Sequence, residues 1–192
     1  MANLFQEQQG LTFQQQLSAE EYSDACLLYE YSLSPLRRPQ VRSGISLCAA
    51  ILLGSLVPWY SVQYATVYFP VTGILVFLSL TLYFWREQPR RHRQNVLDLY
   101  KSNRMLALPS EISIFRDHFL LKNSYESWQE YWTDFSGCVE DSEYYVLWGG
   151  ISRSLLVLKK SSLTSQQAEQ LTLHFSNTFV GRYRCEMHRR SK

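Results

Sequence analysis

The feature that most constrains this chain is a long run without formal charge. Between Arg42 and Arg86 no side chain is Asp, Glu, Lys or Arg. A hydrocarbon core about 30 Å thick is crossed by roughly 20 helical residues. The run therefore predicts a transmembrane hairpin over 43–85, with spans near 43–62 and 66–85 and a very short turn between them. The alternative, two buried helices of a soluble bundle, would need polar faces that this run almost lacks.

Aromatic and basic residues mark the ends of both predicted spans. Aromatic rings gather at the turn and at the far end, as in interfacial belts: Trp59, Tyr60, Tyr64, Tyr68, Tyr83 and Trp85. Arginines flank the hairpin only on the side of the chain termini: Arg37, Arg38, Arg42, Arg86, Arg90, Arg91 and Arg93. The positive-inside rule then predicts a two-pass protein of the cell membrane with both termini in the cytoplasm. The lipid bilayer is the expected partner of these basic flanks.

Small residues recur at four-residue spacing in the first span. Ser46, Ala50 and Gly54 form a stripe that lets helix backbones approach closely. Two interpretations remain open: packing of the second span against the first, or contact with a second copy in a homodimer. Neither predicts a pore, because the run holds no ionisable Asp, Glu, Lys, Arg or His that would mark an ion path.

The segments on either side of the hairpin are hydrophilic. In 1–36, apolar residues alternate from Leu11 to Leu17 and predict a strand, after which Ser18 and Glu21 form a capping-box pattern that opens a helix. The helix of this cytoplasmic strand–helix segment is expected to end before Pro35. Residues 86–104 predict a basic juxtamembrane linker helix. Whether the N-terminal strand joins a sheet further along the chain stays open at this point.

The remaining sequence predicts a folded cytoplasmic domain over 105–180 and a basic tail over 181–192. Short strand-like runs, "SEISIF" and "HFLLKN", meet at Arg116–Asp117, and Gly149–Gly150 between two apolar runs indicates a tight hairpin. Thr164 and Gln167 form a second capping box, opening a helix whose apolar stripe must bury on the sheet; the stripe is Ala168, Leu171, Phe175 and Phe179. The fold class is thus α+β: an antiparallel sheet with a C-terminal helix, anchored by a membrane hairpin.

Two stretches of this domain carry a resemblance to a known family. In "YWTDFSGCVEDSEYYVLW" a tryptophan-led strand ends in an acidic turn, and the residues that match are Trp132, Phe135, Val139 and Glu140. In "LLVLKKSSLTSQQAEQL" an aliphatic strand leads into a capped helix, and Lys159–Lys160 occupy the turn without the usual proline. This pattern resembles the YcxB family of small bacterial membrane proteins. The resemblance implies a compact domain of pleckstrin-homology-like character at the cytoplasmic face, without an established activity or catalytic residues.

No motif for catalysis or metal binding accompanies this layout. The sequence contains no P-loop, GxGxxG, HExxH, GxSxG or paired-cysteine zinc spacing. Four well-separated cysteines favour a reducing compartment, and the "CEMH" at 185–188 offers too few ligands for a zinc site. The acids Glu140, Asp141 and Glu143 are interpreted as a solvated turn between strands. We therefore expect no enzyme activity, no cofactor and no metal.

Aromatic residues are the best sequence-based candidates for a functional surface. There are more of them in 105–180 than a small sheet can bury, so strand alternation predicts an exposed patch that includes Trp128, Tyr131, Tyr145 and Trp148. The main hypothesis is a membrane-anchored regulatory or interaction module that binds a protein partner. The alternative is a lipid- or small-ligand-binding module with a groove between sheet and helix. The basic tail faces a membrane by this account, and no nucleic-acid partner is expected.

Overall fold

The chain divides into two compact units, one of which is built from two separate segments of the sequence. A computed structural model describes residues 10–151 and 155–186 of the 192. One unit comprises Met1–Ser32 with Val96–Lys192, and the other comprises Leu33–Asn95. We call the first the β-domain and the second the helical hairpin. The boundary at Asn95 lies inside helix α4 (Gln88–Ser102), so the predicted linker helix is helical but is shared between the two units.

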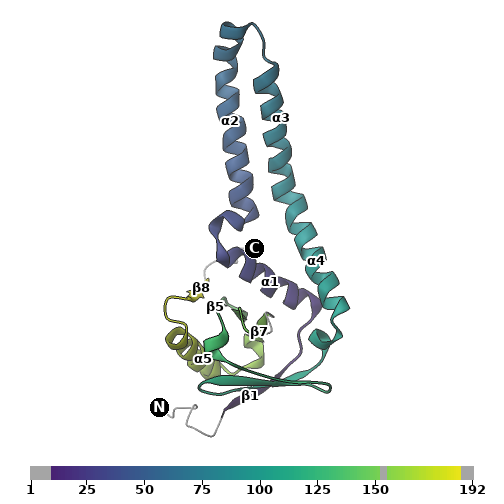
Figure 1. The fold of residues 1–192 in the computed structure, drawn as a ribbon, viewed down its shortest axis with the longest axis vertical. Helices are drawn as coiled ribbons and strands as arrows, with labels where there is room; N and C mark the ends of the chain where they lie inside the picture. Colours follow the sequence, from purple (N-terminus) through teal and green to yellow (C-terminus); the bar gives the residue numbers. More distant parts are fainter. Residues whose placement is uncertain (1–9, 152–154, 187–192) are drawn as a thin grey trace. The chain divides into compact units, whose positions relative to one another are not determined.

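The helical hairpin contains the two predicted spans. Helix α2 (Pro39–Tyr64) ends at Ala65 in the left-handed conformation, with φ 52°, and α3 (Tyr68–Leu82) follows after two more residues. A single left-handed residue is a common way to terminate a helix. The two helices pack along each other (Figure 1). The two predicted segments are therefore confirmed as helices, and the very short turn between them is confirmed as well.

The small-residue stripe contributes only in part to this packing. Ser46 and Ala50 are buried within the hairpin. A side chain built at Gly54 would meet no atom within 4 Å, whereas one at Gly73 would meet Leu53. The close approach of α3 to α2 therefore uses Gly73, which the sequence analysis missed. Gly54 faces open space in the single chain.

The second long helix changes its winding where the basic segment begins. A π-helical turn, η2 (Tyr83–Glu87), joins α3 to α4 without a break. Pro89 follows at once, and a proline ring crowds the carbonyl group four residues earlier in a regular α-helix. The wider π turn relieves that crowding, and the N–H of Gln88 donates to Tyr83 O. Two arginines of the predicted flanks lie over aromatic rings, Arg42 over Phe84 and Arg91 over Tyr83.

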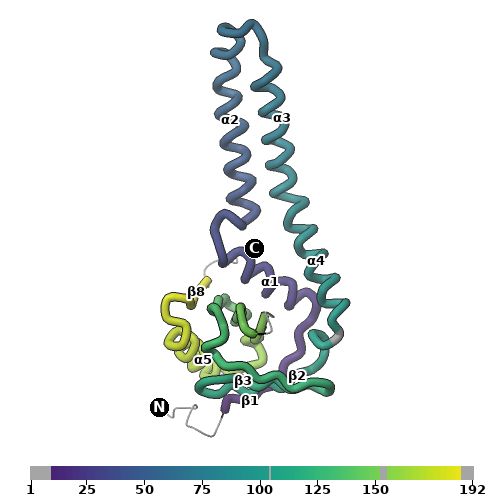
Figure 2. Tube along the Cα trace, in the orientation of Figure 1, coloured from purple at the N-terminus to yellow at the C-terminus, as the bar shows by residue number. Residues whose placement is uncertain are grey.

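The β-domain contains two sheets. The first has the order β1-β2-β3-β4 and is antiparallel throughout; its strands are β1 (Leu11–Gln15), β2 (Ser110–Ile114), β3 (His118–Lys122) and β4 (Ser127–Tyr131). The second has the order β7-β6-β5-β8; its strands are β5 (Gly137–Glu140), β6 (Tyr144–Trp148), β7 (Leu156–Lys159) and β8 (Tyr183–Cys185). Strand β1 thus joins the later strands across the hairpin insertion, and Figure 2 shows it beside β2.

Helices close both faces of the second sheet. Helix α5 (Ser165–Thr178) inserts Leu171 and Phe175 into the main core between the two sheets, as its stripe predicted. Helix α1 (Ala19–Leu33) and Val96 of α4 cover the other face, in a second core with Val139 and Val146. The predicted capping boxes of α1 and α5 both form. Because both faces are covered, β5 and β6 are almost entirely buried.

Short helical turns complete the chain. They are η1 (Pro35–Arg37), η3 (Arg104–Ala107), η4 (Trp132–Asp134) and η5 (Lys160–Ser162). The turn at Arg116–Asp117 between β2 and β3 is confirmed.

Two predictions about the domain boundaries and turns were wrong. Gly149–Gly150 do not form a tight hairpin, because residues 149–155 all lie between β6 and β7. Instead, Gly149 has a φ of 86° and lies against Ser136, and a side chain at Gly150 would overlap the carboxylate of Glu130. The tail also does not begin at 181, since β8 pairs in parallel with β5 and belongs to the domain.

Candidate functional site

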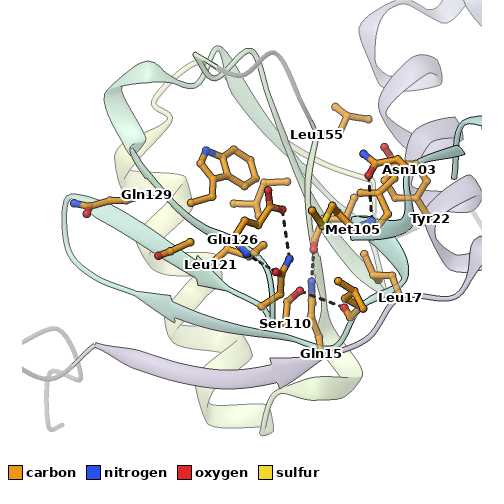
Figure 3. A pocket seen from close by; sticks show the side chains of 17 residues that line it. Gln15, Leu17, Tyr22, Asn103, Met105, Ser110, Leu121, Glu126, Gln129 and Leu155 are labelled. Atoms are coloured by element: carbon orange, nitrogen blue, oxygen red, sulfur yellow. Dashed lines mark hydrogen bonds between the residues drawn. The ribbon is translucent and has the colours of Figure 1, made fainter.

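A cleft opens at one end of the two sheets of the β-domain. Its volume is about 520 Å³, within the range of small-molecule and peptide side-chain sites. The ends of β1 and β3 and the beginnings of β2, β4 and β7 surround it (Figure 3). The residues that line it are Gln15, Leu17, Tyr22, Asn103, Met105, Leu106, Leu108, Ser110, Leu121, Asn123, Glu126, Ser127, Trp128, Gln129, Leu155, Leu156 and Val157. We call it the Trp128 cleft.

The cleft has an apolar interior and an amide-rich rim. Leu121 and Trp128 pack against the main core from this end, and the Trp128 ring meets Phe119 edge to face at 4.9 Å between centroids. Amide and hydroxyl side chains supply most of the polar groups, and Glu126 is the one carboxylate among the lining residues. The described side chains of that lining include no Lys or Arg.

The rim between β3 and β4 is preorganised by one asparagine. Asn123 Oδ1 accepts the backbone N–H groups of Tyr125 and Glu126, both at 2.8 Å. Its Nδ2 donates to Glu126 Oε1 at 3.3 Å. An asparagine that bonds its own turn in this way holds the backbone without help from other elements. The Glu126 carboxylate is therefore positioned at the mouth of the cleft.

On the opposite side, a glutamine side chain covers the free edge of β7. Gln15 Nε2 donates to Val157 O at 2.7 Å, and Gln15 Oε1 accepts the N–H of Lys159 at 2.9 Å. These two bonds imitate a neighbouring strand. The Gln15 side chain is buried. The alternating pattern of residues 11–17 did not indicate that this glutamine bonds to a distant strand.

Replacing this glutamine tests the edge contact. Gln15→Ala leaves the Val157 carbonyl and the Lys159 N–H without partners, so we expect a loss of about 1–3 kcal/mol in the free energy of unfolding. Urea unfolding of the full chain in detergent, followed by pulse proteolysis, measures this loss. The exposed neighbour Gln14 provides the control, because Gln14→Ala changes the value by about 0.5 kcal/mol at most. Equal effects of both variants would show that the bonds to β7 contribute nothing.

The predicted aromatic patch does not exist as one surface. Tyr145 is fully buried, and its hydroxyl donates to Ala168 O at 2.8 Å, so its assignment to an interaction surface was wrong. Trp148 belongs to the second core and packs on Tyr29. Tyr131 is half exposed. Of the four predicted residues, only Trp128 lines the cleft.

The interpretation of Glu140, Asp141 and Glu143 as a solvated turn holds for the exposed Glu143 and is wrong for the other two. Glu140 is completely buried, where Lys160 forms an ion pair with it and Thr172 and Tyr183 donate hydrogen bonds to it. Asp141 is buried too, and its carboxylate accepts the N–H groups of the next turn. The Glu140 cluster links β5, η5, α5 and β8. Both carboxylate oxygens of Glu140 accept hydrogen bonds from these elements, so the cluster has a structural role.

Other titratable residues form no chemical site in the part of the chain that the structure describes. No group of three or more metal-ligating side chains occurs among those residues. Burial raises the pKa of the Cys26 thiol to about 11 and that of Cys138 further, so both thiols stay protonated at neutral pH. Burial lowers the pKa of His174, with a smaller effect from Arg116. Met187 and His188 of the "CEMH" motif, and the tail residues beyond them, lie outside the described residues.

The groove between sheet and helix that the ligand hypothesis needed is absent from the described domain. Leu171, Phe175 and Phe179 have no exposed surface, and they fill the space below α5. The cavity instead lies at the end of the sheets, away from α5. A sequence cannot reveal such a cleft, since residues from five strands must converge to form it.

Comparison of the chain with models of known protein families, with curated proteins and with solved structures finds no match. The resemblance to the YcxB family therefore stays a prediction, and the geometry alone carries the functional argument.

Proposed function

We propose that this chain is a two-pass membrane protein whose β-domain binds a segment of a partner protein in the Trp128 cleft. The single observation that carries the binding function is the cleft itself. The cleft has an apolar interior with a half-buried tryptophan, and hydrogen bonds within the chain hold the amide groups of its rim in place. Protein recognition sites commonly combine a central aromatic residue with a polar rim in this way. The alternative of no ligand would leave a cavity of this size and an accessible tryptophan without a purpose in a small domain.

The membrane anchor rests on the exposed apolar surface of the hairpin. Two helices, Pro39–Tyr64 and Tyr68–Ser102, are long and apolar enough to cross a membrane, and only 11% of the apolar window in each is buried. Large apolar side chains such as Leu52, Leu75 and Leu82 are exposed along both helices. Burying this surface in hydrocarbon contributes about 25 cal/mol per Å². A core helix of a soluble protein would be mostly buried instead.

The basic flanks support an orientation with both chain termini in the cytoplasm. All seven flanking arginines precede α2, lie in its first turns or follow α3, and the turn at 65–67 holds no charge. This distribution matches the positive-inside rule. The β-domain then faces the cytoplasm, where reduced thiols such as Cys185 are stable.

The element order also supports the finer fold class. Two four-stranded sheets, antiparallel except for the parallel β5–β8 pair, pack around a main core with helix α5, which is in keeping with a pleckstrin-homology-like domain. We propose this class for the β-domain, with the hairpin inserted between β1 and β2. A YcxB-family relationship is proposed on the same ground, and no enzyme activity is part of it.

A small apolar ligand is the second candidate for the same cleft, and the volume of about 520 Å³ favours it specifically. Thermal stabilisation of the full chain by a neutral extracted lipid, lost in Trp128→Ala, would identify this case.

Site-specific cross-linking in cells tests the proposed function. A photoreactive benzoylphenylalanine at Met105, a partly exposed residue that lines the cleft, is expected to give a discrete protein adduct. The adduct should disappear when Trp128→Ala is added, because the anchor pocket is lost. A probe at Gln14, exposed on β1, serves as the matched control and should not give this adduct. Adducts with lipid alone, or the same adduct from both positions, would contradict binding of a protein in the cleft.

A further inference from the structure

Strand β4 is the last strand of the first sheet and borders the Trp128 cleft. It pairs with β3 on one side, and the sheet ends there. Its first residues, Ser127 to Gln129, line the cleft. An edge strand presents backbone donors and acceptors to any extended segment that approaches it.

The register decides which backbone groups of β4 point outward. At the two ends of the β3–β4 hairpin, Asn123 N–H donates to Glu126 O and Trp132 N–H donates to Asp117 O. Hydrogen-bonded pairs alternate along an antiparallel ladder, so every second residue of β4 between these ends bonds to β3. The residues that remain point their N–H and C=O groups away from β3; they are Ser127, Gln129 and Tyr131. All three are exposed.

The chain covers the free edge of one strand of the second sheet, β7, by itself. The same alternation directs Val157 O and Lys159 N–H outward from β7, and the Gln15 side chain bonds both of them. The outer edge of β5 is paired with β8. Among the residues that the structure describes, no strand pairs with the outer edge of β4.

The pleat of the sheet connects this edge to the cleft. On β4, the side chains of Trp128 and Glu130 point toward the interior, whereas those of the outward-bonding residues lie on the exposed face. In a strand added next to β4, the residue opposite Trp128 would point to the same interior side, with Cβ atoms about 4.5–5.5 Å apart. An apolar side chain at that position would therefore enter the cleft.

Charge selects the kind of strand that fits. The β3–β4 hairpin, His118 to Tyr131, contains two carboxylates, Glu126 and Glu130, and one lysine, Lys122. Glu126 stands at the rim of the cleft, and Glu130 is buried, with one carboxylate oxygen that has no hydrogen-bond partner among the described residues. A second copy of β4 would bring its own Glu126 and Glu130 to this acidic edge, and like charges across a strand pair are unfavourable. A basic strand is favoured instead.

We propose that β4 binds its partner by strand addition: an extended, basic segment of another protein pairs with the outward backbone groups of β4 and inserts an apolar side chain beside Trp128. This inference rests on the proposed function and specifies its mode. Main-chain bonds supply affinity in such complexes, and alternate side chains supply specificity.

Peptide selection on the full chain tests the proposal. The probes are ten-residue random peptides displayed on messenger RNA, selected against the protein in nanodiscs, with the Trp128→Ala protein as the counter-selection. Enriched peptides should alternate apolar and polar residues with period two and carry net positive charge. In the best peptide, N-methylation of the amides on one set of alternate residues should weaken binding at least tenfold, while methylation of the other set changes it less than threefold.

The variant Gln129→Pro provides the matching test on the protein. This change removes the outward N–H of residue 129 and leaves every hydrogen bond between β4 and β3 in place. Proline is tolerated on an edge strand where its position would not donate to the neighbouring strand. Binding should fall at least tenfold in Gln129→Pro and stay within threefold in Gln129→Ala. If Gln129→Pro unfolds, the methylated peptides still decide the question.

The outcomes separate the two claims. Enriched peptides that need Trp128 but tolerate methylation at all positions, or that are helical or acidic, would overturn strand addition and leave the proposed function standing. The absence of any peptide that depends on Trp128 would overturn both. Enrichment of the chain's own β4 sequence would overturn the basic partner and assign the edge to a second copy.

Discussion

Replacement of Glu140 by alanine is expected to destabilise the β-domain by about 3–5 kcal/mol. The change leaves the Lys160 ammonium largely buried without its counter-charge, because only 15% of that side chain is exposed. Removing one partner of a buried ion pair carries a cost of this size. It also removes the acceptor for Thr172 and Tyr183. The urea midpoint of the full chain in detergent, measured by pulse proteolysis, reports the loss.

Two companion variants give this result its meaning. Glu169 is exposed on α5, so Glu169→Ala should change stability by no more than about 0.5 kcal/mol. The double variant Glu140→Leu with Lys160→Met should recover much of the loss, since apolar side chains of similar volume replace buried ion pairs well. A loss below about 1 kcal/mol in Glu140→Ala would contradict the buried ion pair.

The second large effect concerns Trp132, at the centre of the main core. Its ring is 2% exposed, packs within 5.4 Å of the Phe175 centroid, and donates through Nε1 to Phe115 O at 3.0 Å. Trp132→Ala creates a cavity between the two sheets and orphans that carbonyl group, so we expect a loss of about 3–5 kcal/mol. Pulse proteolysis suits this variant as well, because it does not rely on tryptophan fluorescence.

The variant Trp128→Ala serves as the comparison for Trp132→Ala. Trp128 is only half buried at the cleft wall. Trp128→Ala should therefore cost about 1–2 kcal/mol by area lost, while it abolishes binding. Equal destabilisation by the two variants would mean that Trp128 is a core residue and that the cleft is not a site.

Several elements could be predicted from the sequence because local signals determine them. The absence of charge over 43–85 indicated two helices joined by a short turn, and Ser18 and Thr164 start α1 and α5 through capping boxes that form as expected. The apolar stripe of α5 also identified its buried face. Each of these depends on residues within a few turns of one another.

The errors share a different cause, namely contacts between distant segments. The runs "YYVLW" and "LLVLK" are apolar without alternation, which is the signal of a strand buried on both faces. Applying that signal would have predicted the cover that α1 provides, and with it the burial of Tyr145. Glu140 and Gly150 gave no comparable sign, because their partners Lys160 and Glu130 are 20 residues away in the chain.

The cleft itself lies at the limit of sequence-based prediction. Trp128 was chosen for its type, but its companions Gln15, Asn103 and Leu155 come from segments on both sides of the hairpin. No pattern in any one of these segments indicates that they converge. The edge of β4 is similar, since it follows from the pairing register and not from composition.

The central claim, a membrane-anchored domain that presents the cleft to the cytoplasm, is tested most directly by cysteine labelling in intact cells. Cys48 and Cys185 are replaced by serine, and the buried, protonated thiols of Cys26 and Cys138 are left in place. Single cysteines are then introduced by Thr66→Cys at the turn and Gln129→Cys on the exposed face of β4, next to the cleft. The account predicts that an impermeant maleimide labels position 66 from outside and reaches position 129 only after the cells are permeabilised. Labelling of position 129 in intact cells, or of neither position until permeabilisation, would contradict it.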